Sequence, residues 1–215
     1  MTKVFVFDFD GVIVDSLPIR DEGFRYAFLP YGEKLAIEAK NYHVNNRGIF
    51  RLNKHKLIYK EIIGINANDD QLIATEKRFC EYVFEKLNQV ELLPGVKKLE
   101  EMNKVPLYIV SAAPQEEVLN ILKNKNLINL FSGVFGGPIN KPNHLEFILK
   151  KHSCSPDNLI FIGDAYRDYQ AGMSVGCKFF GITSSNSESI FPSSVETYEN
   201  LLQFFNSDTF CKLYE

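Results

Sequence analysis

Two patterns of hydrophobic and polar positions alternate along the chain. Short apolar runs, rich in β-branched and aromatic residues, end at a glycine or a polar residue, as buried strands do. Four of them lie at 3–7, 105–110, 159–162 and 178–183, and a weaker one ends at Gly136-Gly137. Helical patterns fill the intervals over residues 94–183. This alternation predicts an α/β fold with a doubly wound parallel sheet, helices covering both faces.

Four helices are expected between these strands. Pro94-Gly95 opens the first, which carries Val96, Leu99 and Met102 on one face, and Pro114 begins the second. The third contains Leu145, Ile148 and Leu149, and the fourth follows Asp168. In such sheets, ligands bind at the carboxyl ends of the strands, where most of the polar residues of interest lie.

Residues 16–90 have a different texture, with helical spacing of apolar residues and no strand-like run. We expect Asp15-Ser16 to cap the first helix, and Asp69 or Asp70 to cap a later one. The sequence therefore predicts a core formed by residues 1–15 and 91–215, with an all-helical segment inserted at 16–90.

Composition narrows the class of protein. The 215 residues are 45% hydrophobic, enough for one domain with a modest insertion. A formal net charge of −3 argues against a general nucleic-acid binder. No apolar run reaches the roughly 18–20 residues of a membrane span, and the four cysteines are scattered. We expect a cytoplasmic protein with reduced thiols, independent of membranes, and either a monomer or a weak homodimer.

An acidic pair directly follows the first predicted strand. Side chains alternate along a strand, so Asp8 and Asp10 can project to one side while Phe9 points to the other. Two close carboxylates repel each other unless a proton or a cation lies between them, and magnesium suits oxygen ligands and phosphate chemistry. The alternative is a pair of solvated acids at a strand end.

Three further strand ends carry polar residues. Ser111 and the amides near it, such as that of Ala112, precede a predicted helix and could bind phosphate, although a serine there is often only an N-cap. Lys141 is expected in a loop, where it could neutralise phosphate or simply be solvated. Asp164 and Asp168, four residues apart, face the same way on an incipient helix, or else cap it.

These residues, in this order, resemble the four motifs of the haloacid dehalogenase superfamily of hydrolases. The motifs are Asp8-Phe9-Asp10-Gly11-Val12, Ser111, Lys141, and Gly163-Asp164 with Asp168. The segment at 16–90 is similar to the helical cap of the phosphoglycolate phosphatase and β-phosphoglucomutase branch. The resemblance implies a Rossmann-like core with a helical cap. Ala165 replaces a serine common in relatives, and Tyr166-Arg167 is bulkier than usual.

The resemblance implies a magnesium-dependent phosphatase that acts on a small phosphorylated metabolite. Asp8 would attack phosphorus, and Asp10 would act as general acid and then general base. Magnesium would be held by Asp8, the backbone carbonyl of Asp10, and Asp164, with Asp168 assisting. Residues expected to contact the phosphate are Gly11, Ser111, Ala112 and Lys141.

A basic stretch in the helical segment offers a further candidate site. The stretch from Arg47 to Lys60 contains five basic residues and no acidic residue. If the stretch is helical, Arg47, Arg51 and Lys54 share one face and could bind an anionic substrate, or be solvated.

Other functions remain open at this point. A phosphomutase would use the same four motifs, and a non-catalytic binding protein could retain the fold. A dehalogenase would need neither magnesium nor an acid at Asp10. A phosphonate hydrolase would need a cap lysine, for which Lys54 or Lys56 could be proposed.

Overall fold

The computed structural model describes residues 3–183 and 189–214 and contains two compact units. One unit comprises Met1–Asp15 and Glu91–Glu215, and the other comprises Ser16–Val90. The first unit holds the sheet, and the second is helical. Among the described residues, no helix has both the length and the apolar character needed to cross a membrane.

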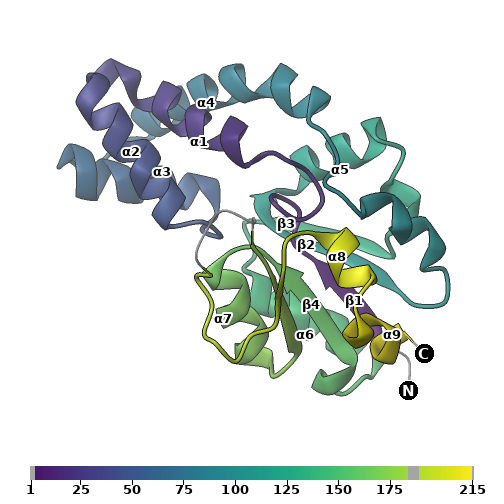
Figure 1. Cartoon of the computed structure of the whole chain (residues 1–215). Helices are drawn as coiled ribbons and strands as arrows, with labels where there is room; N and C mark the ends of the chain where they lie inside the picture. The colour runs from purple at the N-terminus through teal and green to yellow at the C-terminus, as the bar shows by residue number, and fades with distance from the viewer. Residues whose placement is uncertain (1–2, 184–188, 215) are drawn as a thin grey trace. The chain divides into compact units, whose positions relative to one another are not determined.

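The sheet unit is built on six parallel strands (Figure 1), in the order β3-β2-β1-β4-β5-β6. The chain thus starts at the centre of the sheet and builds outwards in both directions, which confirms the predicted α/β class. The strands are β1 (Val4–Phe7), β2 (Leu107–Pro114), β3 (Gly133–Gly137), β4 (Leu159–Gly163), β5 (Lys178–Ile182) and β6 (Thr197–Tyr198). Five correspond to predicted runs, and β6 was not predicted.

Helices cover both faces of this sheet because the central strands are buried on both sides. All four residues of β1 are buried. Val4 and Val6 belong to a core cluster with Leu145 of α6 and Ala171 of α7, whereas the Phe5 ring meets Phe210 of α9. The helices are α5 (Gln115–Asn124), α6 (Lys141–His152), α7 (Tyr166–Val175), α8 (Leu201–Phe205) and α9 (Asp208–Tyr214), with short 3-10 helices η3 (Val96–Glu101), η4 (Ile128–Leu130) and η5 (Pro156–Asn158).

The helical unit has its own apolar core. Phe24 and Phe28 of α1 and Phe79 of α4 are almost fully buried, and the rings of Phe24 and Phe79 lie 5.0 Å apart. A Cβ on Gly23 would lie 2.7 Å from Val83, so glycine lets α1 and α4 pack closely. The elements are α1 (Leu17–Phe28), η1 (Leu29–Tyr31), α2 (Glu33–Asn45), α3 (Arg51–Ile58), the π-helix η2 (Tyr59–Ile63) and α4 (Asp69–Gln89).

Of the two predicted helix caps, one was wrong and the other was right in position only. Asn68, not Asp69 or Asp70, caps α4, and it exchanges a reciprocal pair of hydrogen bonds with Gln71. The carboxylates of Asp69 and Asp70 belong to the first turn instead. Ser16 does occupy the N-cap position of α1, but its side chain makes no capping bond.

Two other boundaries also differ from the prediction. The helix expected from Val96 to Met102 is only the short 3-10 helix η3, which ends at Glu101. Strand β2 continues past Ser111 to Pro114, with a register shift against β3 between Val110 and Pro114.

Candidate active site

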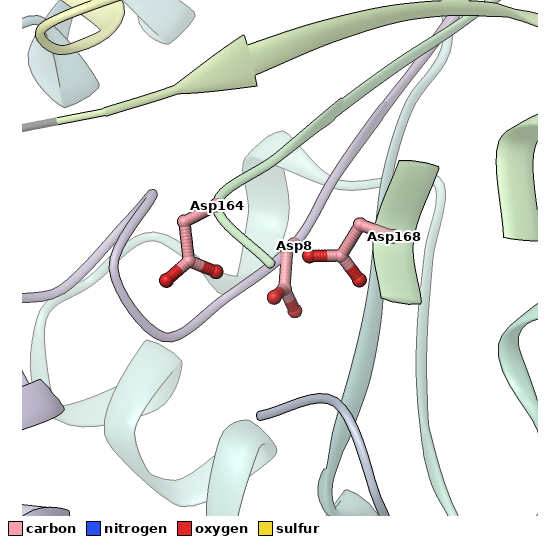
Figure 2. Close-up of side chains that lie close together, drawn as sticks. All are labelled: Asp8, Asp164 and Asp168. Carbon is pink, nitrogen blue, oxygen red and sulfur yellow. The ribbon is translucent and has the colours of Figure 1, made fainter. Parts of the chain in front are cut away.

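Three aspartates bring their carboxylates together at the carboxyl edge of the sheet. Asp8 follows β1, Asp164 follows the neighbouring β4, and Asp168 lies in the first turn of α7. One carboxylate oxygen of each lies within 4.8 Å of the others. Figure 2 shows Asp164 and Asp168 on either side of Asp8. The structure therefore brings together three of the four aspartates predicted as metal ligands.

Strand pairing places Asp8 close to Asp164. Phe7 is in register with Ile162, and the backbone N–H of Asp8 donates to the Ile162 carbonyl over 2.8 Å. The sheet order also reverses direction here, because β2 lies on one side of β1 and β4 on the other. Such a switch point is where open α/β sheets form their ligand sites.

Asp168 is fixed by the start of α7. Its Oδ2 accepts a hydrogen bond from the Ala165 amide at 3.0 Å, which closes the first turn of the helix. The residue is fully buried. A Cβ on Gly163 would lie only 2.5 Å from the Asp168 Cβ, so the close approach of β4 to α7 requires glycine. Sequence reasoning quoted Gly163 as part of a motif but missed this packing role.

Lys141 lies between two of the carboxylates rather than in a solvated loop. Its Nζ is 2.7 Å from Asp8 Oδ1 and 2.6 Å from Asp168 Oδ1. It is the first residue of α6, not a loop residue as predicted, because Asn140 caps that helix by accepting from the Asn143 amide at 3.0 Å. The lysine thus reaches the site from a defined helix start.

The electrostatics of the site are dominated by burial. Burial raises the pKa of Asp8 well above its ordinary value; Asp168 and Asp164 add to this effect, and Lys141 opposes it. Burial alone would lower the pKa of Lys141, but Asp168 and Asp8 outweigh it and raise that pKa. The ammonium group is therefore charged at neutral pH and partly compensates the carboxylates.

The donor set fits a hard divalent cation. When all three acids are ionised, three carboxylates against one ammonium group carry a formal charge of −2. Carboxylate oxygens are the ligands that magnesium prefers, and one such ion would offset the remaining repulsion.

Ser111 and Ala112 lie on the strand next to Asp8. Phe7, the last residue of β1, is in register with Ile109 of β2. Ser111 lies two residues after Ile109, so it is close to the end of β1, which Asp8 follows. Ser111 is buried, and its Oγ accepts from the Ala113 amide at 3.0 Å. It does not precede a helix directly, as the sequence suggested, because the extended backbone continues to Pro114 and α5 begins at Gln115.

Asp10 and Gly11 form a tight loop after β1. Gly11 has a φ of 75°, which favours glycine, and its amide donates to the Val14 carbonyl at 3.0 Å. The amide of Ile13 donates back to the Phe9 carbonyl at 2.9 Å. Asp10 is half-buried, and its carboxylate is not part of the three-carboxylate group. A metal contact through its backbone carbonyl stays a prediction.

The predicted basic face at 47–60 does not exist as a single helix. Arg47 lies between α2 and α3, and its Nη2 is 2.8 Å from both carboxylate oxygens of Asp21. Arg51 is buried, and its Nη2 donates to Glu76 Oε1 at 2.7 Å. Since carboxylates of the helical unit already bind both guanidinium groups, the structure gives them a role in packing that needs no substrate.

Comparison with known proteins agrees with this site. The family model for haloacid dehalogenase-like hydrolases matches residues 5–182. A phosphoglycolate phosphatase of Pasteurella multocida is 30% identical over 191 residues, covering 84% of this chain and 85% of the relative.

Solved structures share the fold. A hydrolase from Pseudomonas syringae superposes with a TM-score of 0.78 at 21% identity, covering 95% of this chain and 97% of its own. The β-phosphoglucomutase of Clostridium difficile gives a TM-score of 0.77 at 20% identity, covering 100% and 97%. With the family model spanning most of the chain, this protein belongs to the haloacid dehalogenase-like hydrolases.

Proposed function

We propose that this protein is a magnesium-dependent phosphatase that hydrolyses a small phosphate monoester through an aspartyl-phosphate on Asp8. The observation that carries the proposal is the group formed by the buried Asp8 and Asp168 and the partly buried Asp164, with Lys141 between the two buried acids. Since the curated relative from P. multocida is a phosphoglycolate phosphatase, phosphoglycolate is the first substrate to test.

Asp8 is the proposed nucleophile. One of its carboxylate oxygens forms a bond to phosphorus while the bond from phosphorus to the alcohol oxygen breaks. Asp10 gives its proton to the departing alcohol oxygen. Water then attacks the phosphorus of the aspartyl-phosphate, Asp10 takes up a proton from that water, and inorganic phosphate leaves with Asp8 restored.

The remaining residues bind and orient the phosphoryl group. Lys141 would exchange part of its contact with the carboxylates for a phosphoryl oxygen, and the Ser111 hydroxyl and the amides of Gly11 and Ala112 would donate to the others. Magnesium, held by Asp8, Asp164 and Asp168 with the Asp10 carbonyl, would supply the positive charge that lets an anionic nucleophile approach an anionic substrate.

We assign the cap role to the helical unit formed by Ser16–Val90. A cap excludes water during the reaction and contacts the part of the substrate that does not react. The internal ion pairs of Arg47 and Arg51 weigh against these two residues as its substrate contacts, because binding an anion would compete with Asp21 and Glu76.

The test is turnover of phosphoglycolate and a panel of other phosphate monoesters by the purified protein with magnesium. We expect release of inorganic phosphate that stops with EDTA and returns with excess magnesium. Asp8→Asn should lower kcat at least about a thousandfold, as loss of a nucleophile does. Its matched control is Asp15→Asn, which removes an exposed carboxylate just outside the motif and should leave kcat unchanged.

Two results would contradict the proposal. The first is full activity in EDTA, which would indicate a reaction that does not depend on the metal. The second is substantial turnover by Asp8→Asn with the same thermal stability as the native protein.

A further inference from the structure

The position of Lys141 depends on the connection between β3 and α6. Its ammonium group contacts Asp8 and Asp168 at hydrogen-bond distance, so a small displacement of the helix start would break one contact or both. The connection leaves the sheet at Gly137 and enters α6 at Lys141. Contacts that fix the position of this connection therefore also fix the position of Lys141.

His144 contacts the start of this connection from α6. Its Nε2 lies 3.2 Å from the backbone carbonyl oxygen of Gly136. Because a carbonyl only accepts hydrogen bonds, this contact is a hydrogen bond when Nε2 carries the hydrogen of the ring. The ring is buried and stacks on Phe135, with centroids 5.1 Å apart and planes 21° apart. Stacking on Phe135 and the contact with Gly136 therefore fix the position and orientation of the His144 ring.

The state of the ring supports the same contact. Burial lowers the pKa of His144, although the carbonyls of Gly136 and Ile139 favour the charged form and Lys141 opposes it. A lowered pKa favours the neutral ring, and with its one hydrogen on Nε2 that ring donates to the Gly136 carbonyl.

Gly136 is held from its other side as well. Its amide donates to the side-chain Oε1 of Gln115 at 3.3 Å. A Cβ at this position would lie 2.5 Å from the backbone of Gln115, so only glycine fits. Gln115 is the first residue of α5. The Gly136 peptide is thus attached to α5 through its N–H and to α6 through its carbonyl.

We propose that His144 is a positioning residue for Lys141. Its Nε2–H, bonded to the Gly136 carbonyl, sets the distance between the end of β3 and the first turn of α6, and so aims the ammonium group of Lys141 between Asp8 and Asp168. The effect on turnover rests on the proposed function, whereas the effect on Lys141 itself does not.

Two substitutions that differ by one methylene test the direction of the contact. In His144→Gln the side-chain amide can place its nitrogen near the position of Nε2, whereas in His144→Asn it is too short to do so. Positioning through Nε2 predicts that Gln preserves the contact and Asn loses it. His144→Phe keeps the ring on Phe135 but removes the donor.

The first measurement is the acetylation rate of each lysine by a small anhydride, followed by mass spectrometry. Lys141 should react slowly in the native protein and in His144→Gln, and on the order of tenfold faster in His144→Asn and His144→Phe, as its burial and ion pairs are lost. Lys150, an exposed residue of the same helix, should react equally in all four proteins.

The second measurement is phosphatase kinetics. His144→Asn and His144→Phe should lower kcat by about tenfold to a hundredfold, as a displacement near 1 Å does, with little change in KM. His144→Gln should restore most of kcat. Inactivity of the native protein would contradict the proposed function and leave the acetylation result to decide the positioning role.

Equal protection of Lys141 in the Gln and Asn variants would overturn the proposal, because the two acids alone would then hold the lysine. Fast reaction of Lys141 in His144→Gln would overturn it too. Should His144→Phe fail to fold, the comparison of Gln with Asn still decides.

Discussion

At the scale of single residues, Lys141 offsets the repulsion among the three carboxylates of the site. Three carboxylates within 4.8 Å of one another, two of them buried, would repel strongly. The ammonium group lies within 2.7 Å of two of them and lowers the local charge. The third, Asp164, is only partly buried.

The sequence predicted the acids of the site better than its lysine. Asp8 ends a recognisable apolar run, and Asp164 and Asp168 are four residues apart, so spacing alone places them. The contact of Lys141 depends on where α6 begins, and Asn140 sets that start as the N-cap. A single capping residue gives no periodic signal, so the lysine was expected in a loop.

A first prediction concerns Asp10, which lies two residues after Asp8 but whose carboxylate is not part of the three-carboxylate group. Asp10→Asn removes the proposed proton donor while keeping the backbone carbonyl. For an alkyl phosphate, whose leaving group needs a proton, the rate of the first step should fall by about a hundredfold or more. For an aryl phosphate with a good leaving group, the fall should be much smaller.

The measurement is a single-turnover experiment that follows release of the alcohol or phenol. Magnesium affinity, measured by calorimetry on the same variant, serves as the control and should change little. An equal loss for both classes of substrate would show that Asp10 is not the general acid.

At the scale of elements, long buried runs were predictable and short or interrupted elements were not. The strand β4 is buried throughout and stands out as an apolar run. By contrast, β6 is two residues long and has no period to detect. The extension of β2 beyond Val110 passes through Ser111 and Ala112, which are small and are uncommon in strand interiors.

The cap of α4 shows how local chemistry decides between neighbouring candidates. Asn68 has an extended backbone, with a φ of −82° and a ψ of 172°, and its Oδ1 accepts from the Gln71 amide at 2.9 Å. The Asn68 amide in turn donates to the side-chain Oε1 of Gln71 at 3.0 Å. Asp69 and Asp70 would also satisfy a simple rule for caps, but only Asn68 has its capping partner three residues later.

This arrangement gives the second prediction. Asn68→Ala should lower the free energy of unfolding by about 1 kcal/mol, because the Gln71 amide at the helix start loses its acceptor. Asp69→Ala is the matched control and should cost less, about 0.3–1 kcal/mol, since it removes only a favourable charge in the first turn. Urea unfolding followed by circular dichroism measures both. A larger loss for Asp69→Ala would mean that the cap lies one residue later.

At the scale of the whole molecule, the two units differ in how they use buried charge. The sheet unit gathers its buried acids at the candidate active site. The helical unit instead buries polar side chains within its core. Lys54 Nζ donates to His43 Nδ1 at 2.8 Å, and the opposite ring nitrogen of His43 lies 3.2 Å from Asp21 Oδ1. His55 is fully buried, with its Nδ1 3.5 Å from Glu76.

Both histidines are held in the neutral form. Burial lowers the pKa of His43 to about 3, with Lys54 and Arg47 acting in the same direction and Asp21 against it. Burial likewise lowers the pKa of His55 to about 3, aided by the neighbouring cations Arg51, Lys54 and Arg78. In the unfolded chain each histidine would titrate near pH 6.5.

The third prediction concerns stability in mild acid. Between pH 6.5 and about 3, the unfolded chain binds protons at His43 and His55 that the folded protein does not bind, so the free energy of unfolding falls as the pH falls. From pH 7 to pH 5 the loss should be about 2 kcal/mol for each histidine. His144 and His152, whose pKa values burial also lowers, add to the fall in the same direction.

Urea unfolding at pH 7 and pH 5 measures this loss, and His55→Met isolates the contribution of one histidine. Methionine fits a site lined by the rings of Phe24, Phe28 and Phe79 and does not titrate, so the variant should lose about 2 kcal/mol less stability than the native protein over the same interval. The imidazole proton resonances of His43 and His55 provide a direct check, since they should not shift between pH 7 and pH 5. Titration of either resonance near pH 6.5, or an unchanged slope in His55→Met, would mean that the helical unit accepts the charged rings and that its stability does not depend on keeping them neutral.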